Sequence, residues 1–255
     1  MKVIVCLKRV PHTAFKIRLP AATGAKAIEA QGVEFTMSPY DEIALAEAVR
    51  LKEKHGPSDV TAVSLGGDEC QAVLRTALAM GADQALHLRA AVPTGLELDG
   101  FQTSNALAAA LRERPFDLLL FGRLAVDDQS SQVGTMTARL LGIPSVADVL
   151  KVEISDGKAS FHHLVEGRIE VVECTLPAAA TAQKGLLEPR YPSIKDIMGA
   201  KKKPFEVREA SLPEQVLETL SLEMPPPRKH GRIVGEGAAA VPELVRLLRQ
   251  EAKVL

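Results

Sequence analysis

The residues best placed for ligand chemistry follow three apolar runs, each typical of a buried strand. A short basic loop follows the run at residues 2–7, and a Gly-Gly turn follows the run at 59–65. A long polar loop at 122–134 follows the third run, at 117–122. Ligands bind beyond the carboxyl ends of the strands in parallel sheets. The three loops therefore predict one binding cleft at a sheet edge.

The loop at 122–134 is the most informative of the three. Gly122 lacks a Cβ, so a ligand can approach its backbone closely. Ser130 or Ser131 could cap the following helix, whose free N–H groups and dipole suit a phosphate. An ordinary strand-to-helix connection with a serine cap would give the same pattern. Asp127 and Asp128 would repel a phosphate; they could instead face away and pin the loop backbone, and their role stays open at this point.

No residue set in the sequence is typical of catalysis or metal binding. His162 and His163 are adjacent on an expected strand, so their side chains face opposite sides and cannot share a metal. Cys6 lies in an expected core strand and is interpreted as an inert buried thiol. The three cysteines form neither a CxxC pair nor a zinc spacing. We therefore expect no catalytic residue and no metal, and favour a binding or carrier role over an enzyme.

Composition argues against a nucleic-acid-binding protein and against a membrane-spanning one. The 31 basic residues balance 32 acidic ones, whereas a general nucleic-acid binder usually carries a basic excess. No apolar run approaches the roughly 20 residues of a membrane span. The first apolar run is also too short for a secretory signal. The sparse cysteines fit a reducing compartment.

Apolar runs alternate with helical patterns over the first 142 residues, which indicates βαβ units. Ser38, Pro39 and Asp41 predict a capped helix start, with Asp41 completing a capping box. Further helices are expected at about 98–113 and 131–141, and a two-stranded excursion at 15–19 and 33–37. The predicted fold class is α/β, with a doubly wound, mostly parallel, Rossmann-like sheet.

The pattern changes after residue 145. Runs at 146–154, 159–165 and 168–176 predict an antiparallel β-meander at 146–176, turned by Ser-Asp-Gly-Lys. Residues 177–203 are interpreted as mostly loop with one short helix. We predict one domain at 1–203 and a C-terminal arm at 204–255, which is proline-rich and irregular until a helix at about 241–252.

The segment at 190–203 places apolar side chains in a polar, proline-bounded loop. Ile194, Ile197 and Met198 could dock into an apolar pocket of a partner. Lys201 to Lys203 could steer acidic partners toward them. A structural loop that folds back on the domain, with a solvated lysine face, is the alternative.

Four segments resemble the beta subunit of the electron transfer flavoproteins, and the similarity runs from Lys2 to about residue 206. They are MSPYDEIALAEAVRLKEK at 37–54, RTALAMGAD at 75–83, AVDD at 125–128 with QVG at 132–134, and, as the most specific string, EPRYPSIKDIMGAKKK at 188–203. The resemblance implies a heterodimer with an alpha subunit that holds the redox FAD. The arm at 204–255 would pack on that alpha subunit.

The resemblance also implies an adenine-nucleotide site, filled by AMP, in this chain. The positions that match the family's AMP contacts are Cys6, Ser38, Pro39, Tyr40, Asp41, Leu65, Gly122, Arg123, Leu124, Ala125, Val126, Asp127, Asp128, Gln129, Ser130, Ser131, Gln132 and Val133. The matching partner-recognition loop is 185–199, with Tyr191, Ile194, Ile197 and Met198. Ile194 stands where an anchoring leucine is usual.

The chain departs from the family pattern at a few positions. Gln129 replaces a third consecutive aspartate, and Gly199 replaces a recognition lysine. His12 and Thr13 follow the first strand, where aspartate or aromatic residues are common. These departures affect details of flavin contact and partner choice.

The expected function is to pass electrons from flavin dehydrogenases, such as the acyl-CoA dehydrogenases of fatty acid oxidation, through the alpha-subunit FAD to a membrane-bound quinone oxidoreductase. The expected location is the cytoplasm of a bacterium or archaeon, or the mitochondrial matrix. One alternative is a bifurcating variant with a second FAD in the AMP site. Another is a stand-alone adenine-nucleotide sensor or hydrolase.

Overall fold

The computed structural model describes residues 1–21, 24–56, 58–92, 98–227 and 231–255. The chain divides into two compact units, Met1–Leu222 and Glu223–Leu255. Residues 228–230 of the expected proline-rich segment lie outside the described residues. None of the helices in the described ranges combines the length and apolar character that a membrane crossing requires.

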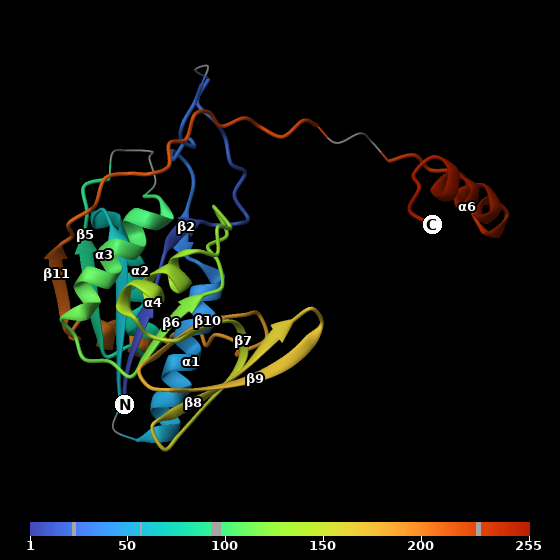
Figure 1. Ribbon diagram of the computed structural model, residues 1–255. Helices are drawn as coiled ribbons and strands as arrows, with labels where there is room; N and C mark the ends of the chain where they lie inside the picture. The colour runs from blue at the N-terminus through green and yellow to red at the C-terminus, as the bar shows by residue number, and fades with distance from the viewer. Residues whose placement is uncertain (22–23, 57, 93–97, 228–230) are drawn as a thin grey trace. The chain divides into compact units, whose positions relative to one another are not determined.

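The first unit is built on one nine-stranded sheet (Figure 1). Its spatial order is β11 (Phe205–Glu209), β5 (Gln84–Arg89), β4 (Asp59–Gly66), β1 (Lys2–Cys6), β6 (Leu118–Gly122), β10 (Ala178–Ala182), β7 (Ser145–Ser155), β8 (Lys158–Val165) and β9 (Arg168–Thr175). Neighbouring strands are parallel from β11 to β7. β7, β8 and β9 pair antiparallel, which confirms the expected meander.

Helices cover both faces of the parallel part of the sheet (Figure 1). The first unit contains α1 (Pro39–His55), α2 (Gln71–Met80), α3 (Gly100–Arg112), α4 (Val133–Leu141) and α5 (Ile194–Ala200). Leu45 of α1 and Leu74 of α2 belong to the buried cluster on one face. Leu107 of α3 and Ala138 of α4 belong to the cluster on the other. The doubly wound α/β fold class is thereby confirmed.

The strand β1 shows why the sequence folds this way. Val3 and Val5 enter one buried cluster, whereas Ile4 and Cys6 enter the other. A strand that is covered on both faces needs an unbroken apolar run, because successive side chains point to opposite sides. The core is mainly aliphatic, and Phe161 is its largest fully buried side chain.

The central strand β10 departs from the expectation that residues 177–203 are mostly loop. Its sequence, Ala-Ala-Ala-Thr-Ala, is buried throughout between β6 and β7. Alanine is depleted in strands, so local propensity gives no signal for this one. The segment forms a strand because it is buried on both faces at the crowded centre of the sheet, where small side chains fit.

Two further expectations are corrected at the edges of the fold. β11 lies at residues expected to be irregular, and it pairs in parallel with β5. The described chain therefore remains part of the first unit well beyond residue 203. The excursion is also shorter than expected: β2 (Arg9–Pro11) pairs with β3 (Phe35–Met37), and residues 15–19 form no strand. The pairing partner of β3 is β2, which follows β1 almost directly in the chain, and residues 15–19 therefore have no place beside β3.

The second unit contains α6 (Val241–Gln250), the expected terminal helix. Val241 and Leu244 are exposed in it. No residue of α6 is buried within the described structure. The apolar side of this amphipathic helix is therefore open to another surface.

Candidate functional site

A cleft of about 510 Å³ opens at the carboxyl ends of β1, β4 and β6. Most residues that the resemblance matched to AMP contacts line it: Cys6, Asp41, Leu65, Gly122, Arg123, Leu124, Ala125, Asp128, Ser130, Ser131, Gln132 and Val133. The other six matched residues, Ser38, Pro39, Tyr40, Val126, Asp127 and Gln129, are neighbours of these in the chain but do not line the cleft itself. The topology thus brings the three expected loops together.

Sequence reasoning missed part of the lining. Ile28, Ala30 and Phe35 enter from the segment between β2 and α1, and Thr103 and Leu107 enter from α3. The apolar members of this set give the cleft a wall suited to a flat ring. The spacing of Thr103 and Leu107 on a helix is a weak signal, because the same pattern is typical of ordinary core packing.

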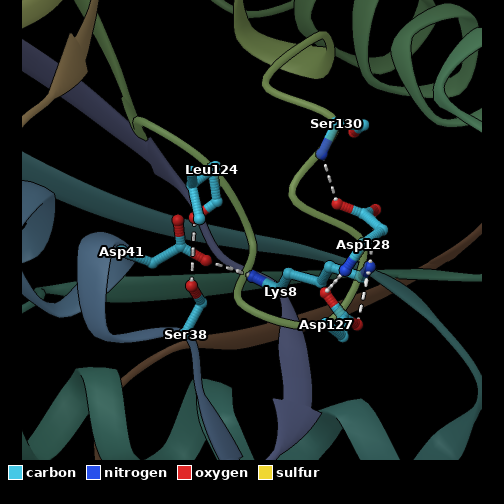
Figure 2. Close-up of polar contacts among 7 residues, drawn as sticks. All are labelled: Lys8, Ser38, Asp41, Leu124, Asp127, Asp128 and Ser130. Atoms are coloured by element: carbon cyan, nitrogen blue, oxygen red, sulfur yellow. Dashed lines mark hydrogen bonds and ion pairs between the residues drawn. The ribbon is translucent and has the colours of Figure 1, made fainter. Parts of the chain in front are cut away.

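Asp41 ties two of the cleft loops together. One carboxylate oxygen accepts the backbone N–H of Lys8 at 2.7 Å. The other accepts the backbone N–H of Gly122 at 3.0 Å. The side chain is almost fully buried. The start of α1 therefore joins the end of β1 to the end of β6. Figure 2 shows the contact with Lys8.

The expected capping box at Ser38 and Asp41 does not form. Ser38 is the N-cap residue of α1, but its side chain makes no capping hydrogen bond. Its hydroxyl donates instead to the carbonyl of Leu124 at 3.4 Å, and the Asp41 carboxylate turns to Lys8 and Gly122. Both side chains bind the neighbouring loops rather than the helix end (Figure 2).

Burial dominates the electrostatics of the cleft floor. It raises the pKa of Asp41 to about 7, against the opposing effect of the hydrogen bonds from Lys8 and Gly122. Burial also raises the pKa of the Cys6 thiol, and the nearby Asp41 carboxylate adds to the effect. Cys6 is therefore a protonated, unreactive thiol at neutral pH, in line with its interpretation as inert.

Asp127 and Asp128 have a clear structural role. Both form ion pairs with the Nζ of Lys8, at 2.8 and 3.0 Å. Asp128 also accepts the backbone N–H of Ser130 at 2.9 Å, and Asp127 accepts that of Asp128. The two carboxylates shape the loop and attach it to the end of β1, as Figure 2 shows.

The loop enters α4 without a serine cap. Gln132 is the N-cap residue, and its side chain makes no capping hydrogen bond. The backbone of Ser131 has a φ of 54°, and that of Gln129 has a φ of 51°. An N-cap residue usually has an extended backbone, so the left-handed conformation of Ser131 explains why the expected serine cap is wrong.

The expected partner-recognition residues lie on and just before α5. Tyr191 and Ile194 are 90% and 79% exposed, and Ile197 and Met198 are also exposed. Ser193 and Asp196 form a complete capping box that starts the helix. The segment therefore presents apolar side chains on a short, ordered helix.

Lys203 differs from the solvated lysine that the alternative interpretation of this segment assumed. Its Nζ donates to the carbonyls of Leu78 and Ala82 at 2.8 and 2.6 Å. These carbonyls belong to the end of α2 and the turn after it. Lys203 thus fastens the segment to the domain, and Ala200 is buried beside it.

The histidines on β8 do not come together. The Nε2 of His162 lies 3.7 Å from Glu153, and that of His163 lies 3.5 Å from Glu170. Among the described residues, no group of three or more histidine, cysteine or acidic side chains could hold a metal ion.

The chain is similar to named proteins over 91–100% of its length. A family model described as "Electron transfer flavoprotein domain" matches residues 25–213. An "electron transfer flavoprotein subunit beta" of Bacillus subtilis (strain 168) is 43% identical over 264 aligned positions, which span 100% of both chains. The protein of that name from Sus scrofa is 37% identical and covers 100% of this chain and 99% of its own. The one from Homo sapiens is 39% identical, with 91% of each chain covered.

Proposed function

This chain belongs to the electron transfer flavoprotein family as a beta subunit, and from that premise we propose that it binds AMP in the cleft and works in a heterodimer with an alpha subunit that holds FAD. The observation that carries the AMP proposal is the cleft itself. Its volume of about 510 Å³ lies within the range of small-molecule sites. Its position beyond the strand ends is that of nucleotide sites in doubly wound folds.

The residue types of the cleft suit an adenylate. Phe35, Leu107 and Leu65 offer apolar surface to a purine ring. The backbone segment that leads into α4 offers N–H groups to sugar and phosphate. We propose that the matched residues from Cys6 to Val133 contact AMP, with those that line the cleft in direct contact and the others supporting them.

The bound AMP serves structure rather than chemistry in this proposal. It fills a cleft between three loops and contributes to stability by mass action, as any ligand that binds only the folded state does. Electrons pass through the FAD of the alpha subunit, whose one-electron and two-electron chemistry the surrounding protein tunes.

Donor dehydrogenases dock on the exposed segment around α5 in this proposal. Tyr191, Ile194, Ile197 and Met198 form an apolar patch of the kind that anchors protein interfaces. The donors are flavin dehydrogenases such as acyl-CoA dehydrogenases, and the acceptor is a quinone oxidoreductase. Electron-transfer encounters are small and weak, so a short helix with a few anchors is sufficient.

The second unit packs on the alpha subunit in this proposal. Its helix α6 contains no buried residue, and the side chains of Val241 and Leu244 are exposed. Complete burial of one large apolar side chain stabilises an association by roughly 1.5–3 kcal/mol. The heterodimer interface would bury the apolar side chains of α6.

Co-expression with and without an alpha subunit tests this proposal. The heterodimer should carry flavin absorbance that an acyl-CoA dehydrogenase with its substrate bleaches, while this chain purified alone should be colourless. Stoichiometric flavin on this chain alone, or hydrolysis of ATP by a monomer, would contradict it and favour a free-standing nucleotide protein.

A further inference from the structure

Lys8 occupies a junction between the end of β1 and the loop that borders the cleft. Its backbone N–H is held by Asp41 at 2.7 Å. Its Nζ lies 2.8 Å from Asp127 and 3.0 Å from Asp128. Figure 2 shows the side chain extended from the cleft floor to the two aspartates. One residue thus connects the buried floor to the loop at 123–132.

The loop needs such an attachment. Gln129 and Ser131 both have positive φ values, which are unfavourable for residues other than glycine. Asp128 holds the turn locally by accepting the N–H of Ser130. The carboxylates that shape the turn are therefore the ones that Lys8 holds in place.

Charge supports the same interpretation. Asp127 is only 10% exposed in its side chain, and it stands next to Asp128. Two neighbouring carboxylates repel each other and would repel an anionic ligand. A single ammonium between them offsets that repulsion and keeps the loop near the cleft. An unattached lysine at a cleft border would instead be expected to contact a phosphate directly.

We propose that Lys8 is a positioning residue of the cleft: it holds the loop at 123–132 in its binding conformation through Asp127 and Asp128, and it is not a phosphate ligand. The proposal rests on the nucleotide-binding function proposed above. It predicts that loss of the ammonium loosens the loop, whether or not a phosphate is present.

Amide hydrogen exchange in the heterodimer tests the attachment without any ligand. The variant Lys8→Met should raise the exchange rates of residues 124–131 by about tenfold, a change typical of lost local protection. The exchange of α3 should stay unchanged. Asp127→Asn combined with Asp128→Asn should give the same increase, and Lys8→Arg should restore protection, because a guanidinium can engage two carboxylates. Lys2→Met, at the opposite end of β1, is the matched control.

Calorimetric titration with AMP and with adenosine separates the two roles of a lysine. A positioning residue affects both ligands through the loop, so Lys8→Met should weaken both by the same factor, about tenfold. Adding the two aspartate substitutions to Lys8→Met should weaken binding little further, since neighbours that act together are not additive.

Three results would overturn or redirect the inference. A loss of affinity for AMP with unchanged affinity for adenosine would make Lys8 a phosphate ligand. Unchanged loop exchange in Lys8→Met and in the aspartate double variant would refute the attachment. If the unmodified heterodimer binds neither compound, the nucleotide function fails, and the exchange experiment still decides whether Lys8 holds the loop.

Discussion

The Oδ1 atom of Asp41 accepts the backbone N–H of Gly122 at 3.0 Å, although the two residues are 81 positions apart in the sequence. This contact joins the first turn of α1 to the end of β6, directly at the cleft floor. It also leaves no room at residue 122: a Cβ there would lie 2.3 Å from Oδ1 and 2.8 Å from the backbone nitrogen of Asp41.

Gly122→Ala should therefore damage both the fold and the cleft. The backbone of α1 cannot move away easily, so we expect the free energy of unfolding to fall by about 1–3 kcal/mol, as for other overpacked sites, and AMP to be lost on purification. Chemical unfolding and nucleotide analysis measure the two effects.

Gly199→Ala is the matched control for that substitution. A Cβ at residue 199 meets nothing within 4 Å, and the residue lies in α5. Alanine in a helix should be neutral or stabilise by up to about 1 kcal/mol. Equal destabilisation by the two alanine variants would refute the steric argument at Gly122.

The buried Asp41 carboxyl should make stability depend on pH. Burial raises its pKa in the folded state to about 7, whereas the pKa in the unfolded state is ~3.9. The folded state then holds a proton that the unfolded state has lost, so this group's stabilising contribution is complete below pH ~4 and is lost as the pH rises to about 7. Between these two pKa values, one such group changes the free energy of unfolding by about −1.4 kcal/mol per pH unit.

Asp41→Asn should remove that slope between pH 5 and 7, although it also lowers stability overall because an amide nitrogen cannot accept an N–H. Urea unfolding of both proteins across this range gives the difference. The same slope in the unmodified protein and in the variant would show that Asp41 does not titrate there.

Ile194→Ala should slow electron transfer from dehydrogenases. Its side chain is 79% exposed, so truncation should leave folding and AMP content intact. Loss of one anchor costs about 2 kcal/mol when it is a hot spot, which corresponds to roughly 30-fold in kcat/KM for reduction by the donor. Ile169→Ala removes an equally large, exposed side chain from β9 and should change nothing. Equal rates for the two variants with every donor would reject the anchor role.

Ending the chain after Leu222 should weaken the heterodimer while the remaining unit stays folded. The contacts of the chain divide at this point, so the cut spares β11, whereas a cut at 203 would remove a strand of the sheet. We expect the dissociation constant to rise at least about tenfold, because the apolar side of α6 would be lost from the interface. Analytical ultracentrifugation measures it, and an unchanged constant would rule out packing of this unit on the alpha subunit.

Much of the fold follows from local sequence patterns. The runs at β1 and β6 are almost wholly apolar, and the run at β4 is mostly apolar with Thr61 and Ser64 within it. Their burial on both faces was therefore predictable, and so was the meeting of their loops. β10 was not predictable in this way, because its alanines carry no strand propensity and only their neighbours in the sheet decide their conformation.

The candidate site was predictable in position but not in its connections. The Ser-x-x-Asp spacing of Ser38 and Asp41, with two residues between them, predicts that Asp41 is a capping residue. Its actual partners, Lys8 and Gly122, lie 33 and 81 positions away. The role of Asp127 and Asp128 was likewise open until the fold placed Lys8 between them. Contacts between distant loops leave no local pattern.

AMP binding in the cleft is tested most directly by the nucleotide content of the purified heterodimer after denaturation, measured by chromatography and mass spectrometry. We predict one FAD and one AMP per heterodimer, with AMP alone lost when the heterodimer carries Gly122→Ala. Two FAD and no AMP, or one FAD with no adenine nucleotide beside it, would contradict it.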